Sequence, residues 1–452
     1  MTGNVQRLDP ALSMRNAIWL MVAVCSILSI SLAISQSKWI YLGIALLPGT
    51  IYISLSRPFV FPFGLYAFLL PFEGVLVVTD ASQGPGPTIT RFLGLFTILV
   101  LVAKGAVEKK LKSPDKIATW WTLFILYAFL SVVWAIQPEF VYPRLPTALG
   151  LLLVYLVVSS YQVQKNDYET IKTMALMGGF LTALIMVYQF VSSTAIASRM
   201  ALSMGDVESG LNKQGFDLLI PMAIGIGKMM EDKTKLWRKG VFGLMVVVCI
   251  FAVIITGSRG NLSAVLGMVL VCIVSVKGLK NKILISGLFV LATALIIPFI
   301  PPFVIDRIQE AISSHASGRS DIWFVGWKSL EKYWFFGAGL DNFTKAYTEF
   351  IAYTPVFIGV DRASHNIFVG LLVELGLVGI SIMLVAMITH YRAIRTELLQ
   401  SDNDRLMLYA AFWGIIISGL SQDILWYKSF WLLWILIVMH KYVMRPQRRL
   451  HI

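Results

Sequence analysis

Charged side chains are scarce in this sequence: only 14% of its 452 residues are Asp, Glu, Lys or Arg, whereas 57% are hydrophobic. A soluble domain of ordinary composition is about 45–50% apolar, even when Gly is counted. So few charges could not cover the surface of a water-soluble chain of this length. The composition therefore argues against a conventional soluble protein and favours one that lies mostly in lipid.

Cysteine is also rare, and Cys25, Cys249 and Cys272 all fall within apolar runs. They predict neither a disulfide framework nor a metal cage. The sequence lacks a Walker motif, a Gly-x-Ser-x-Gly turn and a His/Cys/Glu cluster with metal-ligand spacing. We therefore expect no cofactor and no metal. The net charge of +13 comes from short basic runs between apolar segments, so nucleic acid is not expected as a partner.

Long apolar runs fill most of the chain. A membrane-spanning helix needs about 20 mostly apolar residues, and the sequence predicts an all-α polytopic membrane protein with about fourteen spans. The predicted spans are 17–34, 39–56, 59–78, 89–104, 117–136, 147–162, 170–190, 214–230, 241–257, 260–276, 283–300, 364–389, 405–420 and 429–444.

The basic residues orient these spans. If both termini are cytoplasmic, 25 of the 38 Lys and Arg residues fall on the cytoplasmic side, as the positive-inside rule requires. We expect a multi-pass protein of the inner (plasma) membrane, with eleven spans in 1–300, an outer-face loop at 301–363, and three spans with a cytoplasmic tail in 364–452. The loop is predicted to contain short interfacial helices.

Histidine is limited to five residues. We interpret His390, His440 and His451 as interfacial basic residues at the cytoplasmic side. His365 instead lies on the outer side, after Ser364, which is a suitable N-cap for the next span. The positive end of the helix dipole would then disfavour imidazolium and leave a neutral ring that can act as a general base. The alternative is a histidine that only caps the helix.

Asn366, Gly370 and Glu374 follow at intervals of four and share one predicted helix face. Glu374 would lie about 13 Å below His365. An ionisable residue at that depth normally faces the bundle interior. Glu374 is therefore a candidate for binding an acceptor or an arginine, or for a buried structural pair.

Two arginines are candidates for binding phosphate, because guanidinium matches phosphate oxygens with a rigid fork. Arg259 lies in a Gly-containing turn between two spans, where the alternative is a snorkelling interfacial arginine. Arg319 precedes a predicted amphipathic helix that begins at Ser320 or Asp321. On that helix, Trp323 and Trp327 are interpreted as membrane-interface anchors, although stacking on a sugar is an alternative.

Several short motifs together resemble the O-antigen ligase family, which contains lipopolysaccharide O-antigen ligases and Wzy-type polysaccharide polymerases. The resemblance covers about residues 210–380. The motifs are Gly210-Leu211-Asn212 before a span with Pro221, Ser258-Arg259-Gly260, Gly318-Arg319 followed by Trp323, Gly337-Ala338-Gly339 followed by Phe343, and His365-Asn366 followed by Glu374-Leu375-Gly376. Trp334-Phe335-Phe336 stands where a Pro often precedes the Gly-x-Gly.

The resemblance implies an inverting, metal-independent glycosyltransferase. Its donor would be a glycan on undecaprenyl pyrophosphate in the outer leaflet, and its acceptor a glycan or a lipid. The implied catalytic residues are His365, Arg259 and Arg319. The implied substrate-binding residues are Asn366, Glu374, Asn212, Trp323, Gly337 and Gly339. A chain-length regulator and a flippase are possible partners in such a system.

Three functions remain open from the sequence. The first is a polymerase that joins lipid-linked repeat units of a surface polysaccharide or exopolysaccharide, which the moderate loop and the number of spans favour. The second is a ligase that transfers glycan to a lipid A core or another acceptor. The third is a transporter or flippase of lipid-linked glycan, which would need charges throughout the membrane depth. The candidate charges instead cluster at the outer surface.

Overall fold

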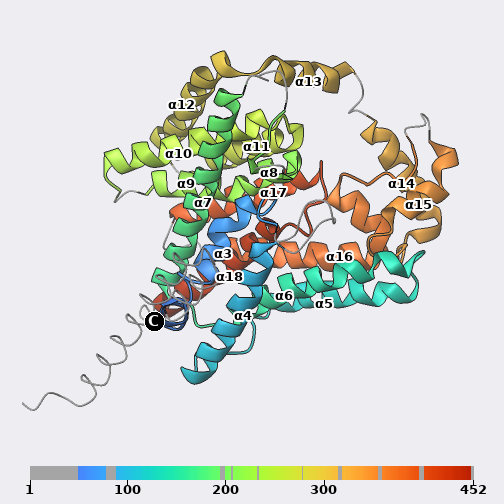
Figure 1. The fold of residues 1–452 in the computed structure, drawn as a ribbon, viewed down its shortest axis with the longest axis horizontal. Helices are drawn as coiled ribbons and strands as arrows, with labels where there is room; N and C mark the ends of the chain where they lie inside the picture. Colours follow the sequence, from blue (N-terminus) through green and yellow to red (C-terminus); the bar gives the residue numbers. More distant parts are fainter. Residues whose placement is uncertain are drawn as a thin grey trace, which may run out of the picture.

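The protein is almost entirely helical (Figure 1). The computed structural model describes residues 49–77, 88–193, 199–204, 207–231, 234–276, 278–313, 318–354, 359–396 and 402–448. The predicted span at 17–34 and most of the one at 39–56 lie outside these residues. A two-stranded antiparallel ribbon, β1 (Ser203–Met204) and β2 (Val207–Glu208), is the sole sheet among the residues listed above.

The helices before the 301–363 loop, which is predicted to lie on the outer face, are α3 (Phe63–Leu69), α4 (Ile89–Val107), α5 (Ala118–Leu130), α6 (Leu145–Ser160), α7 (Lys165–Ser192), α8 (Leu211–Asp217), α9 (Leu219–Met229), α10 (Leu236–Ile255), α11 (Arg259–Ser275) and α12 (Leu279–Ile296). Those of the loop and after it are α13 (Pro302–Ser313), α14 (Arg319–Tyr333), α15 (Phe343–Glu349), α16 (Ile367–Thr396), α17 (Asp402–Gly419) and α18 (Lys428–Arg448).

Five stretches of the described chain are long and apolar enough to cross a membrane: α4, Pro138–Ser160 (which ends with α6), α7, α10 and α16 up to Arg395. Three shorter apolar helical stretches, at Phe63–Phe72, Ala118–Val133 and α11, accompany them. The prediction of an all-α membrane protein is therefore confirmed. The number of fourteen spans stays a prediction.

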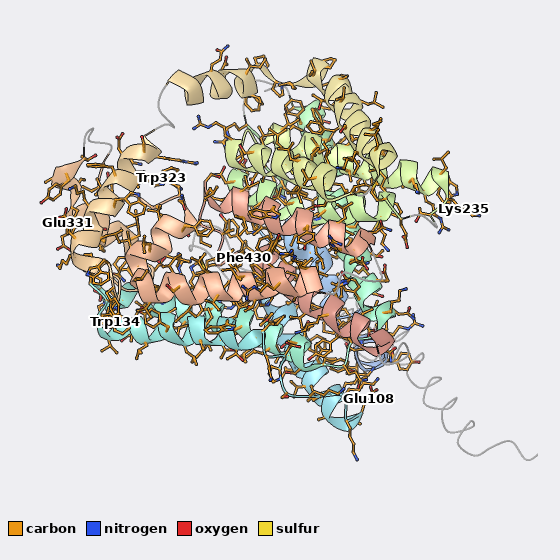
Figure 2. The ribbon with its side chains drawn as sticks, turned by 180° about the vertical axis from the view of Figure 1, so that it is seen from behind. Glu108, Trp134, Lys235, Trp323, Glu331 and Phe430 are labelled. Atoms are coloured by element: carbon orange, nitrogen blue, oxygen red, sulfur yellow. The ribbon has the colours of Figure 1, made fainter. Side chains whose placement is uncertain are left out.

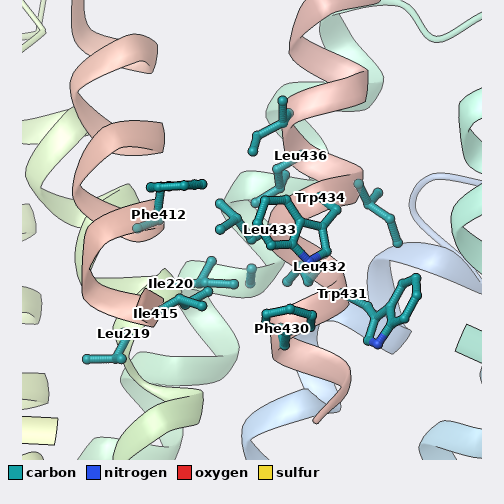
Figure 3. Packing of buried hydrophobic residues seen from close by; sticks show 14 of the residues in the cluster. Leu219, Ile220, Phe412, Ile415, Phe430, Trp431, Leu432, Leu433, Trp434 and Leu436 are labelled. Atoms are coloured by element: carbon teal, nitrogen blue, oxygen red, sulfur yellow. The ribbon is translucent and has the colours of Figure 1, made fainter. Parts of the chain in front are cut away.

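An aromatic cluster forms the centre of the main core (Figure 3). Trp121 of α5 meets Phe430, Trp431 and Trp434 of α18 at ring-centroid distances of 5.2–5.7 Å. His390 of α16 is fully buried against the same rings and bonds Tyr155 Oη at 2.9 Å. The prediction that His390 and His440 are interfacial was wrong, because both side chains are packed inside the helix bundle. His451 lies outside the described residues.

Helix α16 is broken at Gly376, where φ is +64° and ψ is −167°. The break removes helical partners from the carbonyls of Val373 and Glu374. These carbonyls instead accept hydrogen bonds from the N–H groups of Ala338 and Gly339, each at 2.8 Å. The 301–363 loop is therefore joined to α16 by backbone bonds at the kink.

The loop helices α14 and α15 pack beside the N-terminal half of α16, at the end of the molecule that carries Trp134 and Trp323 (Figures 1 and 2). They share a second, smaller core with α16, formed by Ile322, Val325, Phe343, Tyr347 and Val373. This core fixes the start of α16 relative to the start of α14, which is where the candidate functional residues lie.

Candidate functional site

His365 lies just before the first residue of α16, in a left-handed backbone conformation with φ of +49°. Asn366 caps the helix, because its Oδ1 accepts hydrogen bonds from the N–H groups of Phe368 at 2.9 Å and Val369 at 3.2 Å. The prediction of Ser364 as the cap and His365 in the first turn was therefore wrong. The longer Asn side chain takes the capping role, and this turns His365 outward, where its side chain is exposed.

The segment before His365 is held by α14. Trp323 Nε1 donates a 2.8 Å hydrogen bond to the carbonyl of Ser364, and the Ser364 hydroxyl donates to the carbonyl of Asn366 at 3.1 Å. A side chain on Gly370 would meet Ser364 Oγ at 2.6 Å, so a glycine is needed where this turn folds back. The indole of Trp323 therefore holds the segment that leads to the candidate base, His365. The binding of substrate by Trp323 stays a prediction.

Arg319 is the first residue of α14, whereas the sequence predicted that it would precede this helix. Its side chain lies close to His365. Arg362 approaches the same ring. Desolvation by neighbouring atoms lowers the pKa of His365 below its ordinary value, and the positive charges of Arg319 and Arg362 lower it further. The imidazole is thus neutral at physiological pH, as a group that accepts a proton must be.

Replacement of Arg362 by glutamine is expected to shift the acid limb of the pH–rate profile to higher pH. Removing a neighbouring positive charge makes imidazolium less unfavourable, so the pKa of His365 rises and more of the ring is protonated at pH 6. The measurement is the ratio of transfer rates at pH 6 and pH 8 in R362Q and wild type. An unchanged ratio would mean that His365 does not titrate in the rate-limiting step.

Arg259 begins α11, directly after the turn that joins it to α10. Gly257 within this turn has a φ of +60°, which favours glycine. Arg199 packs on the same turn: its Nε donates to the carbonyl of Thr256 at 2.9 Å, and a side chain on Gly257 would meet Arg199 at 3.2 Å. Two arginines therefore lie at this turn, where the sequence identified one.

The C-terminal end of α17 connects the Arg259 turn with the His365 segment. On one side, a Cβ on Gly260 would lie 1.6 Å from Ser421 Oγ. On the other, a Cβ on Gly419 would lie 3.0 Å from the side chain of Ile367, two residues after His365. These close approaches place Arg259 and His365 on either side of one short segment, Gly419–Ser421. The segments that contain Arg259 and His365, 106 positions apart in the sequence, are thus joined through the end of α17.

Asn212 lies in the first turn of α8, and its backbone carbonyl accepts a 2.7 Å hydrogen bond from Asn261 Nδ2. It is therefore tied to the Arg259 turn. The next residue, Lys213, forms ion pairs with Glu73 at 3.2 Å and Asp217 at 2.6 Å, and Lys428 also pairs with Glu73. This network fastens α8 to α18.

Glu374 belongs to a different group, at the α16 kink. Its Oε1 accepts a 3.4 Å hydrogen bond from the N–H of Phe343, and the carboxylates of Asp341 and Asp423 lie close enough for their charges to interact with it. Arg144 Nε binds Asp341 at 2.8 Å. An arginine is thus present near Glu374, as one alternative predicted, but its direct contact is with Asp341.

Gly337 and Gly339 are buried against the kink, with φ of +86° and +99°. A Cβ on Gly337 would lie 2.2 Å from the Glu374 carbonyl, and one on Gly339 would lie 2.3 Å from Ala135. These glycines form a tight turn beside the kink. Their contacts are with protein backbone and side chain, and their binding of substrate stays a prediction.

Sequence reasoning missed Arg199, Arg362 and Arg144 as members of these groups. Each lies on the predicted outer face, which was the available signal, but which outer arginines meet is decided by packing between distant helices. Among the residues that the structure describes, no three His, Cys, Asp or Glu side chains are grouped so that they could hold a metal ion.

Comparison with known proteins gives one family. The family model described as O-antigen ligase matches residues 244–384. The matched segment runs from within α10 to within α16 and contains the Arg259 turn, Arg319, His365 and the α16 kink. No curated protein matches the chain. The resemblance predicted from the short motifs is therefore confirmed over this segment.

Proposed function

We propose that this chain, which carries the O-antigen ligase family segment at residues 244–384, is a glycosyltransferase that uses an undecaprenyl-pyrophosphate-linked glycan as donor and polymerises repeat units of a surface polysaccharide. The observation that supports this most is the placement of a neutral, exposed His365 next to Arg319 and Arg362, across the end of α17 from Arg259. The family segment itself indicates a membrane glycosyltransferase of the O-antigen ligase or polymerase type.

The reaction would be a single displacement. An acceptor hydroxyl oxygen attacks the anomeric carbon of the donor, the bond between that carbon and the phosphate oxygen breaks, and its electron pair leaves with lipid pyrophosphate. The hydroxyl proton passes to a nitrogen of His365. Because attack and departure occur on opposite faces, the anomeric configuration is inverted.

The arginines would supply the positive charge that stabilises the leaving pyrophosphate. Negative charge grows on the leaving pyrophosphate, and preorganised donors aimed at it stabilise the transition state more than the ground state. Arg259 and Arg319 present guanidinium groups from the first turns of α11 and α14. The free N–H groups of a helix start favour the same anion. This arrangement requires no divalent metal.

Replacement of Arg259 by alanine is expected to lower polymer formation about 100-fold or more, as loss of a transition-state donor does. In a strain that lacks the gene, plasmid-borne R259A would leave single repeat units on lipid pyrophosphate, whereas wild type would restore polymer. A matched control is Arg238→Ala, which removes an arginine from the opposite end of α10. Full polymer with R259A would contradict the proposal.

The same experiment separates the second candidate, an O-antigen ligase, which the match to the O-antigen ligase family model favours. A ligase would leave long, finished chains on lipid pyrophosphate in the strain that lacks the gene, because only the transfer to the final acceptor is blocked. Single repeat units indicate the polymerase, and full-length lipid-linked chains indicate the ligase.

A further inference from the structure

Asn261 lies two residues after Arg259, on the first turn of α11, and its side chain is fully buried. Its Nδ2 donates hydrogen bonds to the carbonyl of Asn212 at 2.7 Å and to Ser258 Oγ at 3.0 Å. Its Oδ1 accepts hydrogen bonds from Ser418 Oγ at 2.7 Å and Gln422 Nε2 at 2.8 Å. These four bonds use the full capacity of an amide side chain.

The four partners come from three segments that are far apart in the sequence. Asn212 belongs to α8, Ser258 precedes α11, and Ser418 and Gln422 belong to the end of α17 and the turn after it. One side chain therefore joins the Arg259 turn to both of its neighbours. A buried side chain whose hydrogen-bonding groups are all satisfied fixes geometry more tightly than packing alone.

Two glycines permit this junction. A Cβ on Gly215 would lie 2.5 Å from Asn261 Nδ2, and a Cβ on Gly260 would lie 1.6 Å from Ser421 Oγ. The segments are thus in direct contact around Asn261, with no room for a larger residue or a shifted register. The same α17 end also packs on Ile367, next to His365.

We infer that Asn261 is a positioning residue for the transfer reaction: it fixes the Arg259 turn relative to the α17 end, and hence relative to His365. The inference rests on the proposed role of Arg259. A donor displaced by about 1 Å from the charge it stabilises can cost about 100-fold in rate. Loss of the Asn261 bonds therefore lowers the rate of the chemical step more than it weakens donor binding.

The test uses the purified full-length protein in detergent, with lipid-linked glycan extracted from the strain that lacks the gene as the substrate. Asn261→Leu removes all four hydrogen bonds while keeping the number and branching of the side-chain heavy atoms, and Ser418→Ala removes one. We expect kcat to fall about 100-fold in N261L and less in S418A, while KM for the donor changes by less than about threefold. The control is Tyr155→Phe, which removes one buried hydrogen bond, to His390, within the aromatic core.

A double-mutant cycle of Asn261→Leu with Arg259→Ala decides whether Asn261 acts through Arg259. If Asn261 acts through Arg259, R259A/N261L is no slower than R259A alone. If the rate losses of R259A and N261L multiply in the double variant, the inference is overturned. It is also overturned if kcat falls as much in Y155F as in N261L. If N261L does not fold, S418A enters the same cycle with the same outcomes. Full activity of R259A itself would instead contradict the proposed function, so the two failures are distinguishable.

Discussion

Replacement of His365 by alanine is expected to lower the rate of glycosyl transfer by about 10²–10⁴-fold, the usual contribution of a general base. The variant should fold normally, since the His365 side chain is exposed and the cap of α16 is made by Asn366. The measurement is the initial rate of transfer from lipid-linked glycan by purified H365A and wild type, at equal amounts of folded protein.

His451→Ala is the matched control, because it removes a histidine from the predicted cytoplasmic tail. H365Q tests the role more finely: glutamine retains a hydrogen-bonding group but cannot accept a proton at this pH, so it should be nearly as slow as alanine. A rate for H365A within about threefold of wild type would contradict the assignment of His365 as the base.

Replacement of Gly337 by alanine is expected to destabilise the protein by about 3 kcal/mol or more, because a left-handed backbone and a steric clash act together. The new Cβ would lie 2.2 Å from the Glu374 carbonyl, and the residue has a φ of +86°. Gly376→Ala should have a similar effect, since its Cβ would lie 2.2 Å from the Phe335 carbonyl at a φ of +64°. The measurement is the thermal unfolding midpoint in detergent.

Gly150→Ala in α6 is the matched control for these two variants. A Cβ on Gly150 has no neighbour within 4 Å, and in a helix interior alanine is favoured over glycine by about 0.5–1 kcal/mol. G150A should therefore unfold at the same temperature as wild type or a higher one. Equal midpoints for G337A, G376A and G150A would show that the loop is not locked to α16 as described.

The helical class and the short turns were accessible from the sequence, because each depends on residues close together in the chain. Apolar runs predict the spans, and the turn at Gly337–Gly339 follows from the glycines themselves. The N-cap of α16 was predicted wrongly: Ser364 and Asn366 are both good caps, and the sequence does not decide between them. In the structure the Asn366 side chain caps the helix, and the Ser364 carbonyl accepts a bond from Trp323.

The contacts between distant segments could not be predicted from the sequence. Trp323 meets Ser364 across 41 residues, Asn261 meets Asn212 across 49, and Asn261 meets Ser418 across 157. Such contacts follow from how the helices pack, which periodicity does not encode. For the same reason, the sequence predicted that Glu374 lies below His365 but did not identify its neighbours at the kink, the loop residues Asp341 and Phe343.

These pairings give the proposed site its rigidity. Backbone hydrogen bonds join the loop to the kink of α16. Trp323 fixes the segment before His365, and the hydrogen bonds of Asn261 fix the Arg259 turn. The base and the two predicted phosphate-binding arginines are thus carried by the starts of three helices, α16, α11 and α14. Sites supported by such elements keep their geometry better than sites on free loops.

The most direct test of the account is the amount of polyprenyl pyrophosphate that purified protein releases from lipid-linked glycan, with acceptor present and EDTA in the buffer. We predict that one molecule is released for each glycosidic bond formed, and that H365A and R259A release it at least about 100-fold more slowly than wild type. Bond formation without release of lipid pyrophosphate, or equal release by both variants and wild type, would contradict the account.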